Sequence, residues 1–225
     1  FDFVAFTVLT VARFSIEKNH PTVIEVARRA PELQFVLAGT GYLEEPLRRI
    51  ATPNVRFLGK RNDVPELYRA ADVAFQPTIA ENQSLATLEA MSSGTPILTN
   101  DIPAQRELVE FGREGLLVNG GAAGGIDGYV KALRSLAANP ERTRDMGRAA
   151  RAKVLHGHTL EKNAAALDFL DEVTVLKPDY IEGWNRRATL HYTMGDRRKS
   201  MTDINQVLQR ERQSTGRTAV ELGDR

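Results

Sequence analysis

The sequence predicts an α/β protein with a doubly wound, mostly parallel β-sheet, followed by a segment made only of helices. Apolar, β-rich runs alternate with helical stretches over about the first 120 residues, as in sheets whose strands are connected by helices. Three long helical patterns, at 160–176, 180–194 and 197–210, then follow one another without a strand between them. We therefore expect an α/β lobe at residues 1–158, a helical segment at 159–212 and a polar, frayed tail at 213–225.

Each expected strand is a β-rich run that leads into a loop. The first run, FVAFTVLTVA at 3–12, lacks strict alternation, as does a strand buried on both faces. Pro21 suits the first position of the helix that follows, and Asn62 or Asp63 can cap a later helix. Further strands are expected at 34–38, 54–58, 72–76, 96–99 and, after a turn, within 112–118. Helices are expected at 21–29, 43–50, 64–70, from about 84, and at 105–109, 126–138 and 141–155.

The composition narrows the class of protein. The 225 residues include 30 Lys or Arg and 29 Asp or Glu, which gives no indication of binding to nucleic acid or acidic membranes. The chain has no cysteine, which excludes disulfides and thiolate metal sites and fits a reducing compartment, so we expect a cytoplasmic protein. No apolar run is long enough for a transmembrane segment. Because the chain begins at Phe1, almost directly in a strand, we expect that an upstream part is missing.

Residues 77–99, PTIAENQSLATLEAMSSGTPILT, form the centre of the predicted site. They predict a strand end, a short loop, a helix that begins near Ser84, and a turn into the next strand. Glu81 lies in the loop, and Glu89 lies eight positions later inside the helix. The amides of the first helical turn and the helix dipole favour an anion beside Glu81. A sugar nucleotide offers both hydroxyls and phosphate to such a site; two solvated glutamates on a surface helix are the alternative.

Arg13 and Lys18 lie on the loop between the first strand and the first helix, where open α/β sheets bind ligands. Together they could balance a diphosphate, Arg13 through its forked guanidinium and Lys18 as a point charge. The alternative is a pair of solvated loop cations. Gly39 and Gly41, after the second strand, form either a tight turn or a place where backbone closely approaches a phosphate or ribose.

These patterns resemble the donor-binding motifs of retaining GT-B glycosyltransferases, in particular family four. The Glu-x7-Glu pair and the following Ala-Met-x-x-Gly-x-Pro are similar to the donor-site motif of that family. The run from Ala12 to Lys18 is similar to its Gly-Arg-Leu-x-x-x-Lys loop, with Ala12 for the usual Gly and Phe14 for the usual Leu. The Gly-x-x-Gly-Leu-Leu-Val run at 112–118 is also family-like. The resemblance covers residues 8–163 and implies a Rossmann-like lobe of a GT-B fold.

The resemblance implies a role for each residue. The diphosphate of a nucleoside-diphosphate sugar would lie on Arg13 and Lys18, the ribose hydroxyls on Glu89 and the transferred sugar near Glu81, with no tightly held metal and no cofactor. The implied catalytic residues are Glu81, Arg13 and Lys18. The implied substrate-binding residues are Arg13, Lys18, Gly39, Gly41, Glu81, Asn82, Gln83, Ser84, Leu85 and Glu89.

Two other patterns are interpreted as structural. The glycine-rich run NGGAAGGIDG at 119–128 is read as a flexible connector and not as a phosphate cradle. His156 and His158 flank a glycine at a helix end. With no carboxylate or cysteine near them in sequence, they are interpreted as a helix terminus and not as a metal site.

The helical segment resembles a tetratricopeptide repeat (TPR). Arg187, His191 and Arg212 depart from that motif. About three repeats are needed for a free-standing array, so one repeat and half of another are expected to pack on the α/β lobe or to begin a longer array. The residues at the offsets of the motif are Trp184, Ala188, Gly195, Asp196, Ser200, Ile204 and Val207, after Pro178 at the end of a preceding repeat.

The sequence therefore predicts the donor-binding lobe of a retaining glycosyltransferase. The lobe would bind a nucleoside-diphosphate sugar for transfer to an unknown acceptor. It would be inactive without the N-terminal lobe that carries the acceptor site in the family. The alternative is a non-catalytic TPR-type interaction module, in which the tail binds a protein partner and the α/β lobe is a relic. A fusion of two unrelated fragments is a third interpretation.

Overall fold

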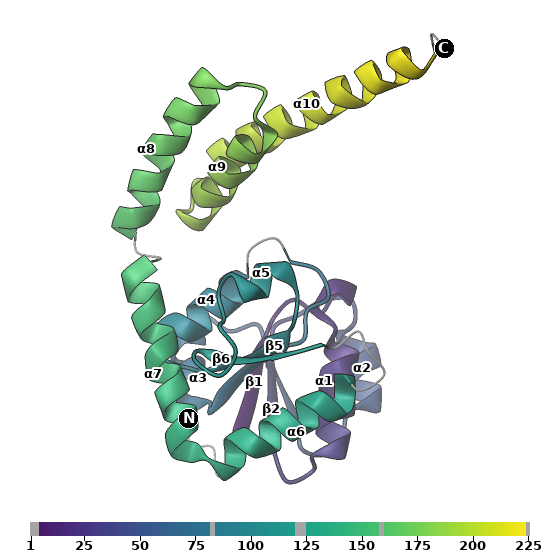
Figure 1. Cartoon of the computed structure of the whole chain (residues 1–225). Coiled ribbons are helices and arrows are strands. Elements are labelled where there is room, and N and C mark those ends of the chain that lie inside the picture. The colour runs from purple at the N-terminus through teal and green to yellow at the C-terminus, as the bar shows by residue number, and fades with distance from the viewer. Residues whose placement is uncertain (1–4, 82–83, 120–124, 158–159, 224–225) are drawn as a thin grey trace. The chain divides into compact units, whose positions relative to one another are not determined.

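The computed structural model describes residues 5–81, 84–119, 125–157 and 160–223. It divides into two compact units, Phe1–His156 and Gly157–Arg225, which we call the α/β unit and the helical unit (Figure 1). The division lies between residues 156 and 157, close to the boundary expected between 158 and 159.

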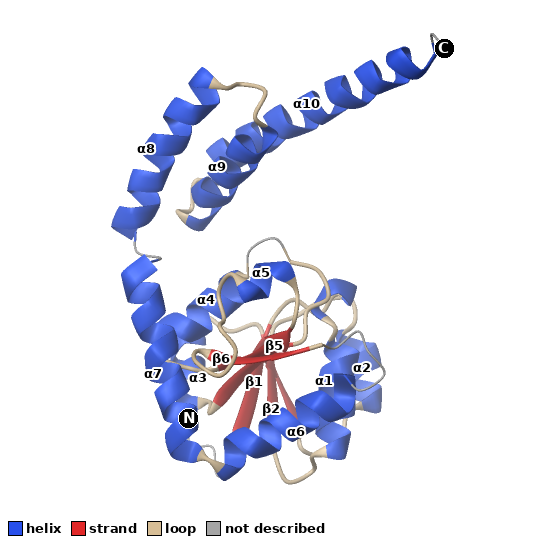
Figure 2. Cartoon of the chain, viewed as in Figure 1, coloured by secondary structure: helices blue, strands red, loops and turns tan. Residues whose placement is uncertain are grey.

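One six-stranded parallel sheet forms the centre of the α/β unit, with strand order β3-β2-β1-β4-β5-β6 (Figure 2). This order confirms the predicted Rossmann-like, doubly wound architecture. Of the apolar run expected as the first strand at 3–12, residues 3 and 4 lie outside the described residues, and the strand that the structure describes begins at Thr7. The strands are β1 (Thr7–Val11), β2 (Gln34–Ala38), β3 (Val55–Gly59), β4 (Val73–Gln76), β5 (Ile97–Asn100) and β6 (Gly115–Val118).

Helices connect these strands, and two of them differ from expectation. The helix expected at 105–109 is instead α5 (Pro103–Arg106), which begins at a proline whose fixed φ suits the first helical turn. α6 begins at Gly125, so the last part of the expected connector at 119–128 is helical, while residues 120–124 lie outside the described residues. α6 ends at Ala138. The others are η1 (Ile16–Lys18, a 3-10 helix), α1 (His20–Arg29), α2 (Glu44–Ile50), α3 (Val64–Ala70), α4 (Leu85–Ser92) and α7 (Pro140–Gly157).

One expected cap forms only in part. Asp63 occupies the N-cap position of α3, but its side chain makes no capping hydrogen bond. Arg61 donates to both Asp63 carboxylate oxygens, at 2.8 and 2.5 Å, and so occupies the group that would cap the helix. This contact also lowers the pKa of the Asp63 carboxyl.

The core lies on both faces of the sheet, because successive strand side chains point to opposite sides. Phe35 and Phe75 belong to a buried cluster formed with α1 and α6. Val36 and Ala74 belong to a second cluster, formed with α3, α4 and α7. The sheet is therefore covered on both sides, and its carboxyl edge carries the loops that follow β1, β2 and β4.

The helical unit consists of α8 (Leu160–Leu176), α9 (Ile181–Thr193) and α10 (Arg197–Gly223). Gly195 lies in the turn between α9 and α10 and has φ +87°. Residues with a side chain rarely adopt this backbone conformation. α10 continues past residue 210, where we expected it to end, through most of the expected tail. Gln, Glu and Arg favour helices, and this explains why a polar sequence is helical there.

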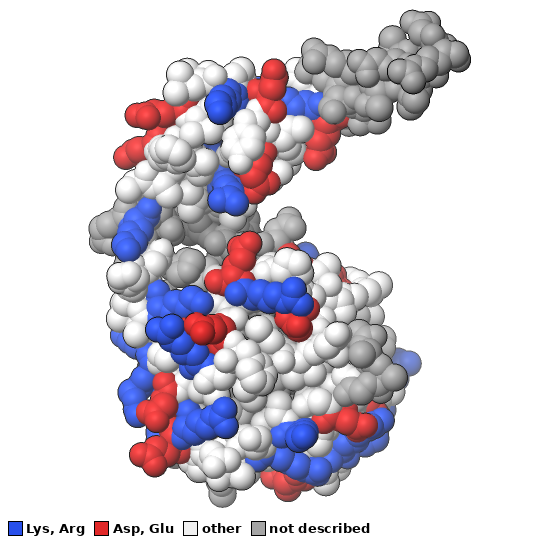
Figure 3. Space-filling model, viewed as in Figure 1, with Lys and Arg blue, Asp and Glu red and all other residues white. Residues whose placement is uncertain are grey.

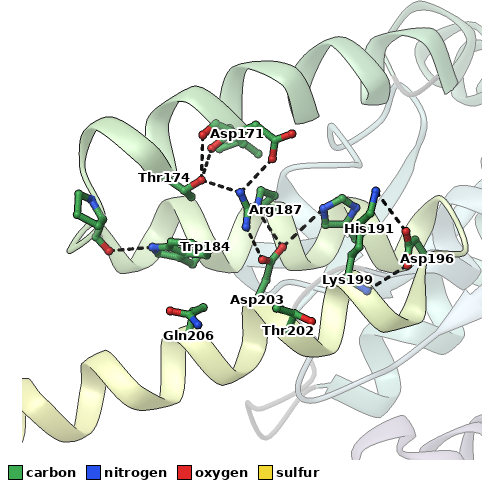
Figure 4. A network of polar contacts seen from close by, with 12 residues as sticks. Asp171, Thr174, Trp184, Arg187, His191, Asp196, Lys199, Thr202, Asp203 and Gln206 are labelled. Carbon is green, nitrogen blue, oxygen red and sulfur yellow. Dashed lines mark hydrogen bonds and ion pairs between the residues drawn. The ribbon is translucent and has the colours of Figure 1, made fainter.

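A polar network joins the three helices of this unit (Figure 4). Arg187 on α9 donates to both carboxylate oxygens of Asp203 on α10, at 3.1 and 2.6 Å. It also donates to Asp171 and Thr174 on α8, at 3.0 and 2.7 Å. Asp203 is 1% exposed, and its contact raises the pKa of Arg187. The departure of Arg187 from the TPR motif is therefore explained by a charged contact between helices.

Candidate functional site

The candidate site lies where β1 and β4 end beside each other. These two parallel strands pair directly, so the loops that follow them leave from the same edge of the sheet. After β1 the chain continues into α1, which packs in the buried cluster that contains Phe35 and Phe75. After β4 it continues into α4, which packs in the cluster that contains Val36 and Ala74. The order of the strands reverses at this point, which is where open α/β sheets bind ligands.

A cation and a carboxylate from these two loops meet. Lys18 Nζ, at the end of η1, donates to Glu81 Oε2 in the loop after β4. Their side chains are 23% and 17% exposed, so water partly reaches both. The structure thus brings together two residues that the sequence placed in one site, although they are 63 positions apart.

Backbone and side-chain bonds fasten the loop after β4 to η1. The carbonyl oxygen of Glu17 accepts from Thr78 Oγ1 and from the Ile79 amide, both at 2.9 Å. Asn19 Nδ2 donates to the Pro77 carbonyl oxygen at 3.2 Å. Asn19 has φ 53°, a left-handed conformation that asparagine tolerates better than most residues. These bonds hold Glu81 beside Lys18.

Arg13 lies on the same loop as Lys18 and is 74% exposed. It forms an ion pair with Glu17 at 3.6 Å, and Ser15 Oγ donates to the same Glu17 carboxylate at 2.5 Å. The hydrogen bond from Ser15 is the main cause that lowers the pKa of Glu17. Glu17 was not among the predicted site residues. Arg13 lies before η1, so the helical rule for residues four apart did not point to this pair.

The start of α4 is well formed. Ser84 is the N-cap, is 3% exposed, and its Oγ accepts from the Thr87 amide at 3.4 Å. The first amides of a helix and its dipole favour a negative group at this end. Leu85 is the first residue of α4, as the sequence predicted for a helix that begins near Ser84.

Glu89 lies on the second turn of α4 and is exposed. Partial desolvation by the surrounding protein nevertheless raises the pKa of its carboxyl. Tyr68 lies near it: burial raises the pKa of the Tyr68 hydroxyl, and the charge of Glu89 contributes to the same shift. None of the ion pairs among the described residues involves Glu89, and its expected contact with a ligand stays a prediction.

Gly39 and Gly41 have a packing role in the structure. A Cβ on Gly39 would lie 1.9 Å from the Ala12 carbonyl oxygen, and Gly39 has φ +144°. A Cβ on Gly41 would lie 2.4 Å from the Phe14 carbonyl oxygen. The glycines therefore let the loop after β2 pack against the loop that carries Arg13. Their expected contact with a ligand stays a prediction.

All predicted site residues that the structure describes lie on the loops after β1, β2 and β4 or on the first two turns of α4. Asn82 and Gln83 lie outside the described residues. On the face drawn in Figure 3, charges of both signs lie next to one another rather than in separate patches. Among the described residues there is no group of three or more His, Asp or Glu that could hold a metal ion. His158, one of the two histidines considered for a metal site, lies outside the described residues. No helix that the structure describes is long and apolar enough to cross a membrane.

Comparison with known families identifies the α/β unit. The model of the family "Glycosyl transferases group 1" matches residues 5–153, and the chain belongs to this family. The match confirms the resemblance seen in the donor-site motifs.

Individual relatives cover parts of the chain. A UDP-Gal:alpha-D-GlcNAc-diphosphoundecaprenol alpha-1,3-galactosyltransferase of Escherichia coli is 30% identical over 141 residues, covering 57% of this chain and 36% of that protein. A TPR repeat-containing protein of Rhizobium etli is 67% identical over 48 residues, covering 21% of this chain and 24% of that protein, which supports the TPR-like assignment in part. The chain spans less than half the length of these relatives.

Solved structures resemble the α/β fold. HepE of Anabaena in complex with UDP-glucose has a TM-score of 0.62 at 22% identity, covering 68% of this chain and 44% of that one. At this identity the likeness establishes the fold alone.

Proposed function

We propose that the α/β unit binds a nucleoside-diphosphate sugar and supplies the donor half of a retaining glycosyltransferase. The observation that carries this proposal is the contact between Lys18 and Glu81, made by two loops that meet where the strand order reverses, beside the start of α4. Family membership and the UDP-glucose bound to HepE support the same class of ligand.

Each residue has a role in this proposal. The donor diphosphate lies against Arg13, Lys18 and the first amides of α4, and the two ribose hydroxyls donate to Glu89. Glu81 lies near the sugar that is transferred, because it is fixed next to Lys18. When the bond between the sugar and the diphosphate breaks, negative charge grows on the diphosphate, and the cations and amides stabilise it.

The proposal that transfer proceeds with retention rests on the family and on one relative. The name of the E. coli relative describes an alpha linkage made from UDP-Gal. Since UDP-galactose carries its sugar as the alpha anomer, such a product keeps the donor configuration. We propose further that transfer requires a second lobe that contributes the acceptor site, and that the protein acts in the cytoplasm.

Calorimetry with UDP-glucose, UDP-galactose and GDP-mannose tests the donor site. Glu89→Ala should lose roughly 1.5–3 kcal/mol of donor affinity, because a charge-assisted hydrogen-bond acceptor is removed. Arg13→Ala should weaken binding by a similar amount. Arg49→Ala is the matched control, since Arg49 is 78% exposed on α2 and pairs only with Glu45 among the ion pairs described. Unchanged binding in both Glu89→Ala and Arg13→Ala would rule out the assignment.

A second candidate function is protein interaction through the helical unit, with a non-catalytic α/β unit. The observation that favours it is the 67% identity to part of a TPR repeat-containing protein. A turnover assay with and without an added N-terminal lobe separates the two candidates. Transfer that appears when the lobe is added supports the enzyme. Donor binding that never leads to transfer, together with capture of a partner by residues 157–225, supports the interaction module.

A further inference from the structure

Gln105 is a fully buried polar residue next to the start of α4. It lies on α5, in the segment that follows β5, and is 0% exposed. Thr87 Oγ1 donates to Gln105 Oε1 at 3.1 Å. Thr87 is the third residue of α4, so a residue outside the predicted site reaches the helical turn that the proposed donor site uses.

The hydroxyl groups of Thr87 and Ser84 continue this contact. Thr87 Oγ1 lies 2.8 Å from Ser84 Oγ, and Thr87 and Ser84 are 0% and 3% exposed. A threonine hydroxyl has one hydrogen, so when it donates to Gln105 it must accept from the Ser84 hydroxyl. Ser84 Oγ keeps its lone pairs for the Thr87 amide, which donates to it at 3.4 Å. Gln105 therefore sets which of the two hydroxyls donates to the other, next to the bond from the Thr87 amide to Ser84 Oγ that caps α4.

Hydrogen bonds hold the backbone of Gln105 in place on both sides. Its amide donates to the Ile102 carbonyl oxygen at 3.0 Å, and its carbonyl oxygen accepts from the Val109 amide at 2.8 Å. Within the described residues, Gln105 Nε2 has no hydrogen-bond partner although it is buried. A buried amide with one unsatisfied end destabilises a fold, and an apolar side chain of similar size would avoid this cost. The presence of a glutamine at this position therefore indicates a role other than packing.

We propose that Gln105 is a positioning residue of the donor site. Through Thr87 and Ser84 it fixes the first turn of α4, so that the amides of this turn point at the donor diphosphate. Gln105 touches neither the sugar nor the base. This inference rests on the proposed function, because it assigns the diphosphate to the start of α4.

The test compares the affinities of UDP and uridine, measured by calorimetry on the full chain. Gln105→Met keeps the side-chain volume and removes the hydrogen bond, and Thr87→Val removes the hydroxyl. Both should weaken UDP binding roughly five- to tenfold, as expected when a helix cap is weakened, and leave uridine binding within about twofold. Thr87→Ser keeps the hydroxyl and should bind UDP as the wild type does. Equal UDP affinity in Gln105→Met and wild type, or an equal loss for uridine, would overturn the proposal.

Hydrogen exchange provides a readout that needs no ligand. The Thr87 amide should exchange faster in Gln105→Met and Thr87→Val but not in Thr87→Ser, while sheet amides keep their protection. Unchanged exchange in both variants would also overturn the proposal, even if one of them weakened UDP binding through partial unfolding. A wild-type chain that binds no UDP, UDP-sugar or GDP-sugar would instead defeat the proposed function, and this inference with it.

Discussion

The α/β unit and the helical unit differ in how they treat buried polar groups. In the α/β unit the helices cover the sheet with apolar side chains, and His20 is fully buried with neither ring nitrogen bonded to a described residue. In the helical unit, the buried Asp203 is bonded to Arg187 by two hydrogen bonds. The α/β unit also has a buried charged contact, since Glu114, which is 2% exposed, lies 3.4 Å from Arg113 and 3.6 Å from Lys153. Its larger apolar core can nevertheless tolerate an unsatisfied group, whereas the three helices have less apolar surface to bury and depend more on one charged contact between helices.

Asp203→Ala should produce the largest effect, a loss of roughly 3–5 kcal/mol of stability in the helical unit, because the partly buried Arg187 loses its buried carboxylate partner. Trp184 is the only tryptophan, so its fluorescence during urea unfolding reports this unit alone. Glu182→Ala, which removes an exposed pair with Arg186, should cost less than about 1 kcal/mol. The double variant Arg187→Met, Asp203→Leu should recover most of the loss. Equal effects of Asp203→Ala and Glu182→Ala would contradict the comparison.

His20 should make the stability of the α/β unit depend on pH. Burial, followed by the charge of Lys18, lowers the pKa of His20 from 6.5 to about 4. The unfolded chain therefore binds a proton that the folded chain excludes, and stability falls as the pH drops from 6.5 toward 4, by up to roughly 3 kcal/mol. Exchange of sheet amides, corrected for intrinsic rates, measures this loss. In His20→Phe, the loss of stability between pH 6.5 and pH 4 should disappear. If this loss persists in the variant, His20 is not its source.

The smallest effect concerns Glu89, whose carboxyl has a raised pKa and no cation partner in the described residues. A raised pKa means that the folded state favours the protonated form, so the unprotonated form is destabilising above that pKa. Glu89→Gln should therefore stabilise the α/β unit slightly, by less than about 1 kcal/mol at pH 7, while it weakens donor binding. Thermal unfolding and calorimetry measure the two effects. A variant that loses both stability and affinity would indicate that Glu89 supports the fold rather than a ligand.

Much of the α/β unit could be predicted from the sequence, because each strand is a mostly apolar run and is followed within two residues by a glycine or a polar residue. That Lys18 and Glu81 lie in one place could be predicted from the rule that adjacent parallel strands end at the same edge, together with the family motifs, but their direct ion pair was not predicted. Gln105 could not be predicted in the same way. Its contact with Thr87 depends on where α5 begins, and Pro103 moves that start two residues ahead of the expected helix.

The helical unit was less predictable in its interior. The TPR offsets gave the three helices and the turn at Gly195, but they marked Arg187 and His191 only as departures. Asp203, the partner of Arg187, lies 16 positions further along the chain on another helix, and no local pattern links the two. The continuation of α10 beyond residue 210 was also missed, because polar composition was interpreted as a frayed tail although the residue types favour a helix.

Hydrogen exchange of the full chain with and without UDP-glucose tests the central claim most directly, because it reports both units in one measurement. The donor site predicts slower exchange in two segments, residues 13–19 and the first turn of α4, and no change in α9 and α10. Protection that is absent from both segments at saturating UDP-glucose, or that appears only in the helical unit, would contradict the account.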